Sequence, residues 1–346
     1  MIVTKYCMMP FTELNCGVGG LYPCCSSWLV KYGSDVRSSI AGISSYWHSD
    51  IMNKFRLSII DGSYSYCATN CPNRLDPANS YLMKSLDEIQ TSYPVDIAES
   101  IIDSITQKTN FNNDILTLGL SYDRTCNLHC KPCRKEPIHD NQRYVDLQHN
   151  RIKSYFDIAR VLYLSGDGDP FASEYYFDLL KNDLHQLCPN LTSIKLQSNG
   201  ILFNESNWNQ IHPNNRKLID TVTISVDAAH PDTYHKIRLG GDFNTLLSNL
   251  EFISTLRNKN VINKLITSYT VNKYNYNEMA DFIDLAFANQ FDLIQFWGMK
   301  EWGRGESLLT LGVHLPIFPL YSSFTDELNK AKLTASKYKQ QVQFSF

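Results

Sequence analysis

The stretch that decides the fold is Ser121-Tyr-Asp-Arg-Thr-Cys126-Asn-Leu-His-Cys130-Lys-Pro-Cys133-Arg134. Its three cysteines have the spacing C-x3-C-x2-C, and the apolar run just before them, 115–120, alternates and ends like a β-strand. Three thiolates on one short loop can hold a compact inorganic centre and leave one metal position without a cysteine. An open coordination position is where a metal centre does chemistry.

Three interpretations of this loop compete. Cysteine is among the most buried residue types, but the neighbouring Arg124, His129 and Lys131 make this loop polar. A zinc site usually takes four ligands from two separated pairs, so His129 would have to act from between the cysteines. Iron–sulfur clusters are held by closely spaced thiolates. The spacing therefore favours a cluster over zinc, and zinc over a purely structural role.

This spacing after a strand resembles the radical S-adenosylmethionine (SAM) enzymes. In that family the three cysteines bind three irons of a [4Fe–4S] cluster, and the fourth iron takes the amino and carboxylate groups of SAM. The resemblance implies that Cys126, Cys130 and Cys133 hold such a cluster. It also implies reductive cleavage of SAM to a 5′-deoxyadenosyl radical, which abstracts hydrogen from a substrate. Pro132 departs from the family, which usually has an aromatic residue there.

From about residue 114 the chain alternates between strand-like and helical segments. Asn244–Leu256 has one apolar helix face, and the helical pattern Asn277–Ala286 opens with Asn277 as a capping residue. Such alternation predicts an α/β fold with a parallel sheet. Six strands fall short of the eight in a complete barrel, and the resemblance implies a partial (β/α)6 TIM-like barrel. The predicted strands are Ile115–Ser121, Val161–Ser165, Ser193–Gln197, Thr221–Val226, Lys264–Val271 and Asp292–Trp297.

Polar residues follow several of these strands, where parallel α/β folds carry their functional loops. After the second strand, residues 165–170 resemble the family segment that binds the SAM amino group, with Asp167 in the acidic position. At the end of the third strand, a simple turn explains Ser198 and Asn199 as well as a SAM contact does. The candidates in these two loops are Ser165, Gly166, Asp167, Gly168, Asp169, Ser198 and Asn199.

Two further segments complete the candidate SAM site. Ser225 and Asp227 lie on one face at the end of the fourth strand, and the resemblance implies contacts with the ribose hydroxyls. Arg238, beside two glycines, resembles the arginine that meets the SAM carboxylate. A bidentate arginine–carboxylate contact is strong and geometrically selective.

A second group of cysteines lies near the amino terminus. Cys7 is followed by Gly19 and then Cys24, and Cys67 and Cys71 form a C-x3-C pair. Four thiolates suit zinc or an Fe–S cluster, and spacing alone does not choose between them. The pattern resembles the SPASM/twitch auxiliary-cluster domains, although these normally follow the barrel and have more cysteines. The resemblance implies one auxiliary [4Fe–4S] cluster on Cys7, Cys24, Cys67 and Cys71, with Cys25 as the alternative to Cys24 and Cys16 as a bystander.

The predicted organisation follows from these assignments. Residues 1–75 form a small cysteine-rich auxiliary-cluster domain, and residues 76–113 form a helical connector. Residues 114–304 form the radical SAM partial barrel. Residues 305–346 form a carboxy-terminal helical extension, with a polar helix at Thr325–Gln341.

Composition limits the compartment and the partners. The net charge of −3 gives no electrostatic argument for binding nucleic acid or an anionic membrane. The first ten residues lack a signal-peptide core, and no apolar run is long enough to span a bilayer. Ten cysteines without a secretion signal predict metal binding in a reducing cytoplasm rather than a disulfide scaffold.

The predicted activity is that of a radical SAM enzyme supplied with electrons by a flavodoxin or ferredoxin-type donor. The leading substrate is a ribosomally made peptide or protein side chain that undergoes cross-linking, epimerisation or oxidation. The alternative is dehydrogenation or rearrangement of a small molecule such as an aminosugar or amino-acid derivative. A non-enzymatic, zinc-stabilised binding protein is the third possibility. The cofactor does the difficult chemistry while the protein positions the substrate.

Overall fold

The structure is a computed structural model, and it describes residues 4–24, 29, 43–69, 71–77, 80, 82–301, 305–338 and 341–346. Cys25, the alternative to Cys24 as a ligand, lies outside the described residues. The chain divides into two compact units. The first consists of residues 1–122, 142–163 and 184–192, and the second of residues 123–141, 164–183 and 193–346.

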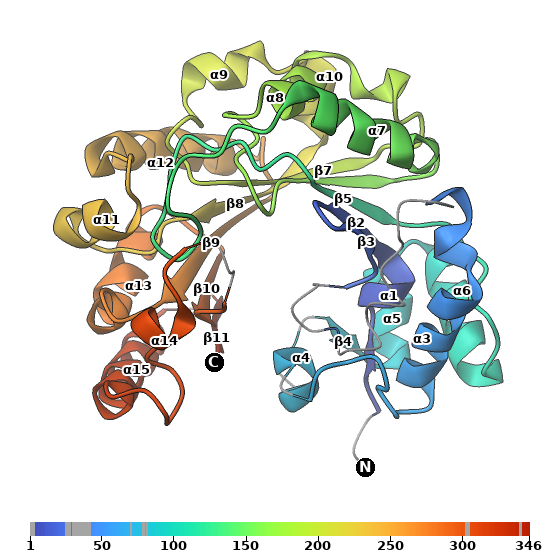
Figure 1. Cartoon of the computed structure of the whole chain (residues 1–346), viewed down its shortest axis with the longest axis horizontal. Helices are drawn as coiled ribbons and strands as arrows, with labels where there is room; N and C mark the ends of the chain where they lie inside the picture. The colour runs from blue at the N-terminus through green and yellow to red at the C-terminus, as the bar shows by residue number, and fades with distance from the viewer. Residues whose placement is uncertain are drawn as a thin grey trace. The chain divides into compact units, whose positions relative to one another are not determined.

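The fold class is α/β with a mostly parallel sheet, as predicted for a partial TIM-like barrel (Figure 1). Each of the six predicted strands is present within a few residues of its expected bounds. They are β5 (Thr117–Ser121), β6 (Val161–Leu164), β7 (Ser193–Ser198), β8 (Ile219–Ser225), β9 (Lys264–Val271) and β10 (Leu293–Gly298).

In the first unit, the strand order is β6-β5-β2-β3, with β2 at Glu13–Gly17 and β3 at Gly20–Tyr22. Strand β2 runs parallel to β5, with Leu14 opposite Leu118, and antiparallel to β3. A separate pair joins β1 (Tyr6–Cys7) to β4 (Met83–Lys84). The amino-terminal residues therefore share a sheet with the first predicted barrel strand, a pairing that the sequence-based division at residue 75 does not anticipate.

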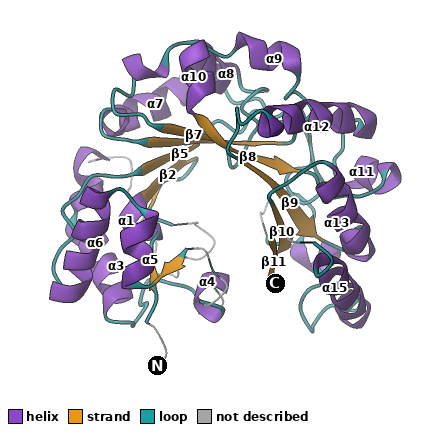
Figure 2. Ribbon diagram, turned by 180° about the vertical axis from the view of Figure 1, so that it is seen from behind, coloured by secondary structure: helices purple, strands orange, loops and turns teal. Residues whose placement is uncertain are grey.

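The helices of the first unit pack around an apolar core that includes Phe11, Leu14 and Phe55, each at most 1% exposed (Figure 2). Arg56 lies inside this core, where it donates to the carbonyls of Pro10 and Trp47 and covers the Trp47 ring at 4.3 Å. The elements are α1 (Met9–Thr12), η2 (Ile43–His48), α3 (Asp50–Ile60), α4 (Pro72–Leu75), α5 (Leu86–Ser92), α6 (Val95–Gln107), α7 (Gln142–Phe156) and η3 (Leu184–Gln186).

In the second unit, strands β7, β8, β9, β10 and β11 are neighbours in that order, and each pair is parallel. Buried and partly exposed residues alternate along β7 and β9, as expected where one sheet face is packed. Helices α11, α12, α13 and α15 lie on one side of strands β8 to β11 (Figure 1). The helices are α8 (Glu174–Lys181), α9 (Glu205–Gln210), α10 (Pro213–Leu218), α11 (Pro231–Ile237), α12 (Phe243–Asn258), α13 (Met279–Ala288), α14 (Leu308–Leu311) and α15 (Tyr321–Ala335).

Two predicted helices show what the local sequence pattern does and does not predict. Helix α12 contains the predicted apolar face and begins where the Asp242 side chain accepts from the N–H of Thr245. The prediction that Asn277 caps the next helix is wrong. Residues Tyr276–Glu278 form a 3₁₀ turn, α13 begins at Met279, and the carboxylate of Glu278 binds Ala229 and Thr233 instead.

The carboxy-terminal segment contains a strand as well as a helix. The helix predicted at Thr325–Gln341 is observed as α15, which ends at Ala335. Strand β11 (Gln341–Ser345) follows and pairs parallel with β10, with Phe344 opposite Phe296 and their rings stacked at 5.1 Å. The expectation of a purely helical extension is therefore corrected. The short pattern Gln341–Ser345 has too few residues to reveal its pairing partner from sequence.

Candidate active site

Backbone hydrogen bonds hold the cysteine loop, defined here as Asp123–Arg134. The N–H of Cys126 donates to the carbonyl of Ile138 at 3.1 Å. The N–H groups of His129 and Lys131 donate to Leu239 and Ile237 at 3.0 and 2.9 Å. These last two bonds fasten the loop to the end of α11, immediately beside Arg238. The loop is therefore positioned by main-chain contacts and does not depend on side-chain packing alone.

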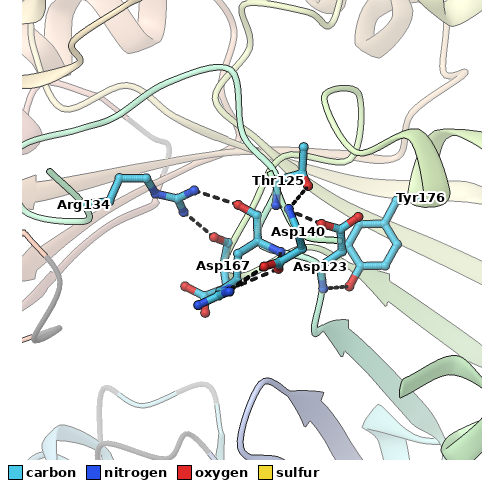
Figure 3. Close-up of polar contacts among 7 residues, drawn as sticks. Asp123, Thr125, Arg134, Asp140, Asp167 and Tyr176 are labelled. Atoms are coloured by element: carbon cyan, nitrogen blue, oxygen red, sulfur yellow. Dashed lines mark hydrogen bonds and ion pairs between the residues drawn. The ribbon is translucent and has the colours of Figure 1, made fainter. Parts of the chain in front are cut away.

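Charged side chains brace the start of the same loop (Figure 3). Asp123 is buried; its carboxylate accepts from the N–H of Thr125 at 2.9 Å and from the Ser173 hydroxyl at 2.5 Å. Its own N–H donates to the Tyr176 hydroxyl at 3.0 Å. Arg124 forms a close ion pair with Asp140 at 2.5 Å. These contacts fix the backbone that leads into Cys126.

The glycine loop after β6, residues 165–170, approaches the cysteine loop very closely. A Cβ atom on Gly168 would lie only 2.6 Å from the carbonyl oxygen of Thr125 and 2.7 Å from that of Asp123. The N–H of Asp169 donates to the same Thr125 carbonyl at 2.9 Å. Glycine is required at position 168 because any side chain would force the two loops apart.

A cavity of about 140 Å³ opens between these loops and the carboxyl ends of β7, β8 and β9. It is lined by eleven of the thirteen predicted cluster and SAM residues. They are Cys126, Cys130, Cys133, Gly166, Asp167, Gly168, Ser198, Asn199, Ser225, Asp227 and Arg238. Ser165 and Asp169 of the predicted set are not among the lining residues. Segments 140 residues apart in sequence thus meet at one site.

Each of the three thiols in the cavity has an N–H donor within hydrogen-bonding range of sulfur. Cys126 receives the N–H of Leu128 at 3.5 Å and the Asn199 side-chain amide at 3.6 Å. Cys130 receives Arg238 at 3.5 Å. Cys133 receives Nε and Nη2 of Arg134, both at 3.3 Å. Such donors favour the ionised form of sulfur, which is the form that binds metal.

Burial opposes ionisation of Cys126 and Cys130. It raises the pKa of Cys126 to about 12, with a further increase from the Asp169 carboxylate. Burial also raises the pKa of Cys130, although Arg238 acts against it. Metal binding at this loop must therefore displace thiol protons.

Asp169 supports the site through hydrogen bonds to residues of the neighbouring loop. It is completely buried, and its carboxylate accepts from the Ser198 hydroxyl and the Asn199 N–H, both at 2.8 Å, and from the N–H of Phe171 at 3.0 Å. Its oxygens are therefore occupied within the protein. Asp167 lines the cavity and is the better placed of the two acids.

Asp227 and Arg238 form a buried ion pair with an N–O distance of 2.7 Å. Burial alone would lower the pKa of Arg238, but the Asp227 carboxylate raises it well above its ordinary value. The other oxygen of Asp227 accepts from the N–H of Thr270 at 2.7 Å. Nε of Arg238 is buried and has no hydrogen-bond partner among the described residues. The pair therefore leaves one buried N–H donor of Arg238 without a partner among the described residues.

Two site residues have a left-handed backbone that sequence reasoning did not foresee. The φ angles are +76° at Ser165 and +62° at Asp227. A residue other than glycine costs of order 1–3 kcal/mol in such a conformation and persists where its surroundings hold it. Ser165 donates to the Gly168 carbonyl at 2.8 Å, and Asn275 donates to the Asp227 carbonyl at 2.9 Å.

Comparison with known proteins agrees with this geometry. The model of the radical SAM superfamily matches residues 120–286, from the end of β5 to α13. The segment 120–286 belongs to the radical SAM superfamily. Members of that family are enzymes that use a [4Fe–4S] cluster and SAM. In the part of the chain that the structure describes, no helix is long and apolar enough to cross a membrane.

Two curated relatives are named GTP 3′,8-cyclase. The protein of Clostridium perfringens (strain SM101 / Type A) is 27% identical over 210 residues, which is 58% of this chain and 60% of the relative. The protein of Alkaliphilus metalliredigens (strain QYMF) is 24% identical over 245 residues, which is 65% of this chain and 71% of the relative. The matched part of this chain thus spans 60% of the length of the first relative.

Solved radical SAM structures are also similar. Streptococcus suis SuiB is 12% identical, with a TM-score of 0.47, and the match covers 85% of this chain and 61% of SuiB. SuiB bound to its precursor peptide SuiA is 14% identical over 86% of this chain and 62% of that chain, with a TM-score of 0.47.

The residues of this radical SAM site fit a cluster with SAM. Three thiols converge on one cavity, N–H donors face each sulfur, and Nε of Arg238 has no partner among the described residues. In the described part of the chain, no three His, Cys, Asp or Glu side chains are close enough to hold a single metal ion.

The amino-terminal cysteines lie in the first unit. Cys7 is in β1, Cys71 lies just before α4, and Cys24 follows β3. Burial raises the pKa of Cys7 to about 12, and the charges of Cys67 and Cys71 raise it further. Burial and Cys71 likewise raise the pKa of Cys67 to about 12. Cys7, Cys67 and Cys71 therefore lie close enough to influence one another.

Cys16 is separate from the other amino-terminal cysteines. It lies in the middle of β2, is 2% exposed and stands opposite Leu120 of β5. Its burial in the sheet explains its presence without a ligand role, as expected for a bystander.

Sequence reasoning missed several residues that shape the site. Arg134, Gln197 and Thr270 line the cavity, and Asp123 and Asp140 brace the cysteine loop. Arg134 and Asp123 lie within the stretch that decides the fold, but the sequence pattern assigns them no role. An arginine directly after the third cysteine is the signal that could have identified Arg134. Nothing in the sequence indicates that the Asp140 carboxylate forms an ion pair with Arg124.

Proposed function

We propose that Cys126, Cys130 and Cys133 ligate a [4Fe–4S] cluster whose fourth iron binds SAM. The observation that carries this proposal is the convergence of the three thiols with Asn199, Asp227 and Arg238 on one cavity. When bound, the cluster supplies the electron that cleaves SAM and yields the 5′-deoxyadenosyl radical for hydrogen abstraction.

The protein's own residues would bind and orient SAM. Nε of Arg238 is free to donate to the SAM carboxylate while Nη2 stays paired with Asp227. Asp167 and the backbone of Gly166 and Gly168 are available to the amino group. Asp227 and Ser225 lie on the ribose side. Asp169 acts indirectly, because its carboxylate holds Ser198 and the Asn199 backbone in place.

We propose that Cys7, Cys67 and Cys71, with Cys24, ligate an auxiliary [4Fe–4S] cluster in residues 1–75, a SPASM/twitch-like domain placed before the barrel at 114–304. Its support is the mutual influence of three of the four thiols and the absence of a single-ion site among the described residues. The remaining parts would be the connector, 76–113, and the segment 305–346. The enzyme would work in the cytoplasm with a flavodoxin or ferredoxin-type donor, away from nucleic acid and membranes.

For the substrate, the first candidate is a ribosomally made peptide or a protein side chain. It rests on the auxiliary cluster, because radical SAM enzymes that resemble this chain in having one mostly modify such peptides. The auxiliary cluster would accept an electron from the substrate radical or help to bind the substrate. The reaction would be a cross-link, an epimerisation or an oxidation.

A second candidate is a small, anionic molecule, and two observations favour it. The curated relatives named GTP 3′,8-cyclase act on a small molecule by their name. In addition, the ammonium groups of Lys236, Lys273 and Lys131 lie 4.4, 5.0 and 5.9 Å from the centre of the Tyr274 ring. Only Lys131 has an ion-pair partner among the described residues, Glu306 at 2.9 Å. This basic cluster, next to the cysteine loop, suits a phosphate or carboxylate.

One experiment tests the function and separates the candidates. The protein is reconstituted anaerobically with iron and sulfide, reduced with dithionite and given SAM, and 5′-deoxyadenosine is measured. Roughly eight irons per chain are expected if both sites hold [4Fe–4S] clusters. A peptide encoded beside the gene, or GTP, is then added, and the true substrate raises 5′-deoxyadenosine formation above the substrate-free rate. A colourless protein with bound zinc, no sulfide and no SAM cleavage would overturn the proposal.

A further inference from the structure

Arg134 has a buried guanidinium whose hydrogen bonds go to two backbone carbonyls and one sulfur. The residue is 4% exposed. Its Nη1 donates to the Arg124 carbonyl at 2.7 Å, and its Nη2 donates to the Asp167 carbonyl (Figure 3). Nε and Nη2 both point at the Sγ of Cys133, at 3.3 Å. Among the charges near Arg134, Cys133 has the largest favourable effect, ahead of Cys126 and the Asp167 carboxylate.

The two other arginines near the cysteines are paired differently. Arg124 has Asp140 at 2.5 Å. Arg238 has Asp227 at 2.7 Å in addition to Cys130. A buried guanidinium is costly unless an anion compensates its charge. For Arg134 the group that can do so through direct hydrogen bonds is the sulfur of Cys133.

The same side chain connects both loops of the site. The bond to the Arg124 carbonyl ties Arg134 to the start of the cysteine loop, and the bond to the Asp167 carbonyl ties it to the glycine loop. The planar guanidinium has several N–H donors in a fixed geometry, and lysine does not reproduce that geometry. One residue thus sets the distance between a metal ligand and the segment proposed to bind the SAM amino group.

We propose that Arg134 is a positioning residue that holds the Cys133 ligand and raises the reduction potential of the SAM-binding cluster. This rests on the proposed assignment of Cys126, Cys130 and Cys133 as cluster ligands. The cluster gains one electron from dithionite in the test, or from the flavodoxin or ferredoxin-type donor, and thereby one negative charge. Hydrogen bonds to sulfur and a nearby positive charge stabilise this reduced form more than the oxidised form.

The test is an anaerobic redox titration of the reconstituted full-length protein, followed by electron paramagnetic resonance. The signal that changes on addition of SAM identifies the SAM-binding cluster and separates it from an auxiliary cluster. Arg134→Gln should disfavour reduction of this cluster at least tenfold, a downward shift of about 59 mV for one electron. Arg134→Lys, which keeps the positive charge but not the planar set of N–H donors, should give a smaller shift.

Arg257→Gln is the matched control. It removes an equal charge that is paired with Asp292 away from the cavity, so its potential should remain close to that of the wild type. A wild-type potential in Arg134→Gln, or an equal shift in Arg257→Gln, overturns the proposal. If Arg134→Gln takes up no iron while its iron-free form unfolds at the wild-type temperature, the fold is intact and the positioning role is supported. The reduction potential of the cluster is then measured in Arg134→Lys. A wild-type protein that binds no cluster would instead refute the proposed function.

Discussion

The two cysteine groups of this chain differ in the charges that surround them. In the cysteine loop, guanidinium groups of Arg238 and Arg134 donate to Cys130 and Cys133. Around Cys7, the charged neighbours are other cysteines and Glu13, all of which raise its pKa, while Arg74 acts against the raised pKa of Cys67. In the loop, guanidinium groups contact sulfur directly, which stabilises thiolates and a reduced centre. This difference suits a centre that must take up an electron for chemistry in the loop, and a supporting role for the amino-terminal group.

The largest expected effect comes from removing the loop thiols. The triple variant Cys126→Ala, Cys130→Ala, Cys133→Ala should lose all SAM cleavage and about four irons per chain, because no other described thiol lines the cavity. Iron analysis and a 5′-deoxyadenosine assay after anaerobic reconstitution measure both. Cys188→Ala is the control, since Cys188 is buried outside both groups. Retained cleavage in the triple variant would contradict the assignment.

Removing the amino-terminal thiols should separate the two roles. Cys67→Ala with Cys71→Ala should also remove about four irons, yet substrate-free SAM cleavage should persist because the loop site is intact. Turnover of the true substrate should be lost. Metal analysis after purification distinguishes the alternatives: zinc in the wild type that disappears in the double variant would assign this group to zinc. An unchanged iron content in the double variant would contradict the auxiliary cluster.

The two regions also differ in how much of their structure could be predicted from the sequence. The loop spacing, the six strands and the residues at strand ends were predictable, because a parallel sheet brings its carboxyl-terminal loops to one edge. Asp227 and Arg238, eleven positions apart in sequence, were expected to meet separate parts of SAM. Their direct ion pair depends on how α11 returns to the end of β8, and no local pattern contains that information.

The amino-terminal region was harder to predict for a related reason. Its strand β2 pairs with β5, more than a hundred residues away in sequence. Neither Glu13–Gly17 nor Gln341–Ser345 is long enough to identify its partner, because a five-residue pattern has no distinct period. The core around Phe11 and Phe55 likewise becomes visible only once α1 and α3 pack together.

A smaller effect is expected where the two loops of the site touch. In Gly168→Ala, the new methyl group would meet two backbone oxygens at 2.6 and 2.7 Å, so the glycine loop must shift. We expect SAM binding at least tenfold weaker and a loss of stability of about 1–3 kcal/mol. Equilibrium binding of SAM and thermal unfolding measure these effects. Gly62→Ala, where no atom lies within 4 Å of the new methyl, should leave SAM affinity unchanged; wild-type affinity in Gly168→Ala would show that the loops adapt freely.

The smallest effect should come from a charge outside both cysteine groups. Asp292 precedes β10 and accepts from Nε of Arg257 and the N–H of Leu265, both at 2.7 Å. Burial alone would raise the pKa of Asp292, but these donors hold it below its ordinary value. Because the folded pKa is the lower one, the stabilisation is complete above the unfolded pKa of about 3.9 and is lost as the pH falls through the folded value.

Asp292→Asn should therefore reduce the free energy of unfolding at pH 7 by about 1–2 kcal/mol, since the pair is partly exposed to solvent. The difference from the wild type should shrink as the pH falls below about 4. Urea unfolding of the iron-free protein at several pH values measures it, with Asp326→Asn, an exposed carboxylate on α15, as the control. SAM cleavage at pH 7 should be unaffected, because Asp292 is not at the cavity. A pH-independent difference would show that Asp292 stabilises the fold through neutral hydrogen bonds instead of its charge.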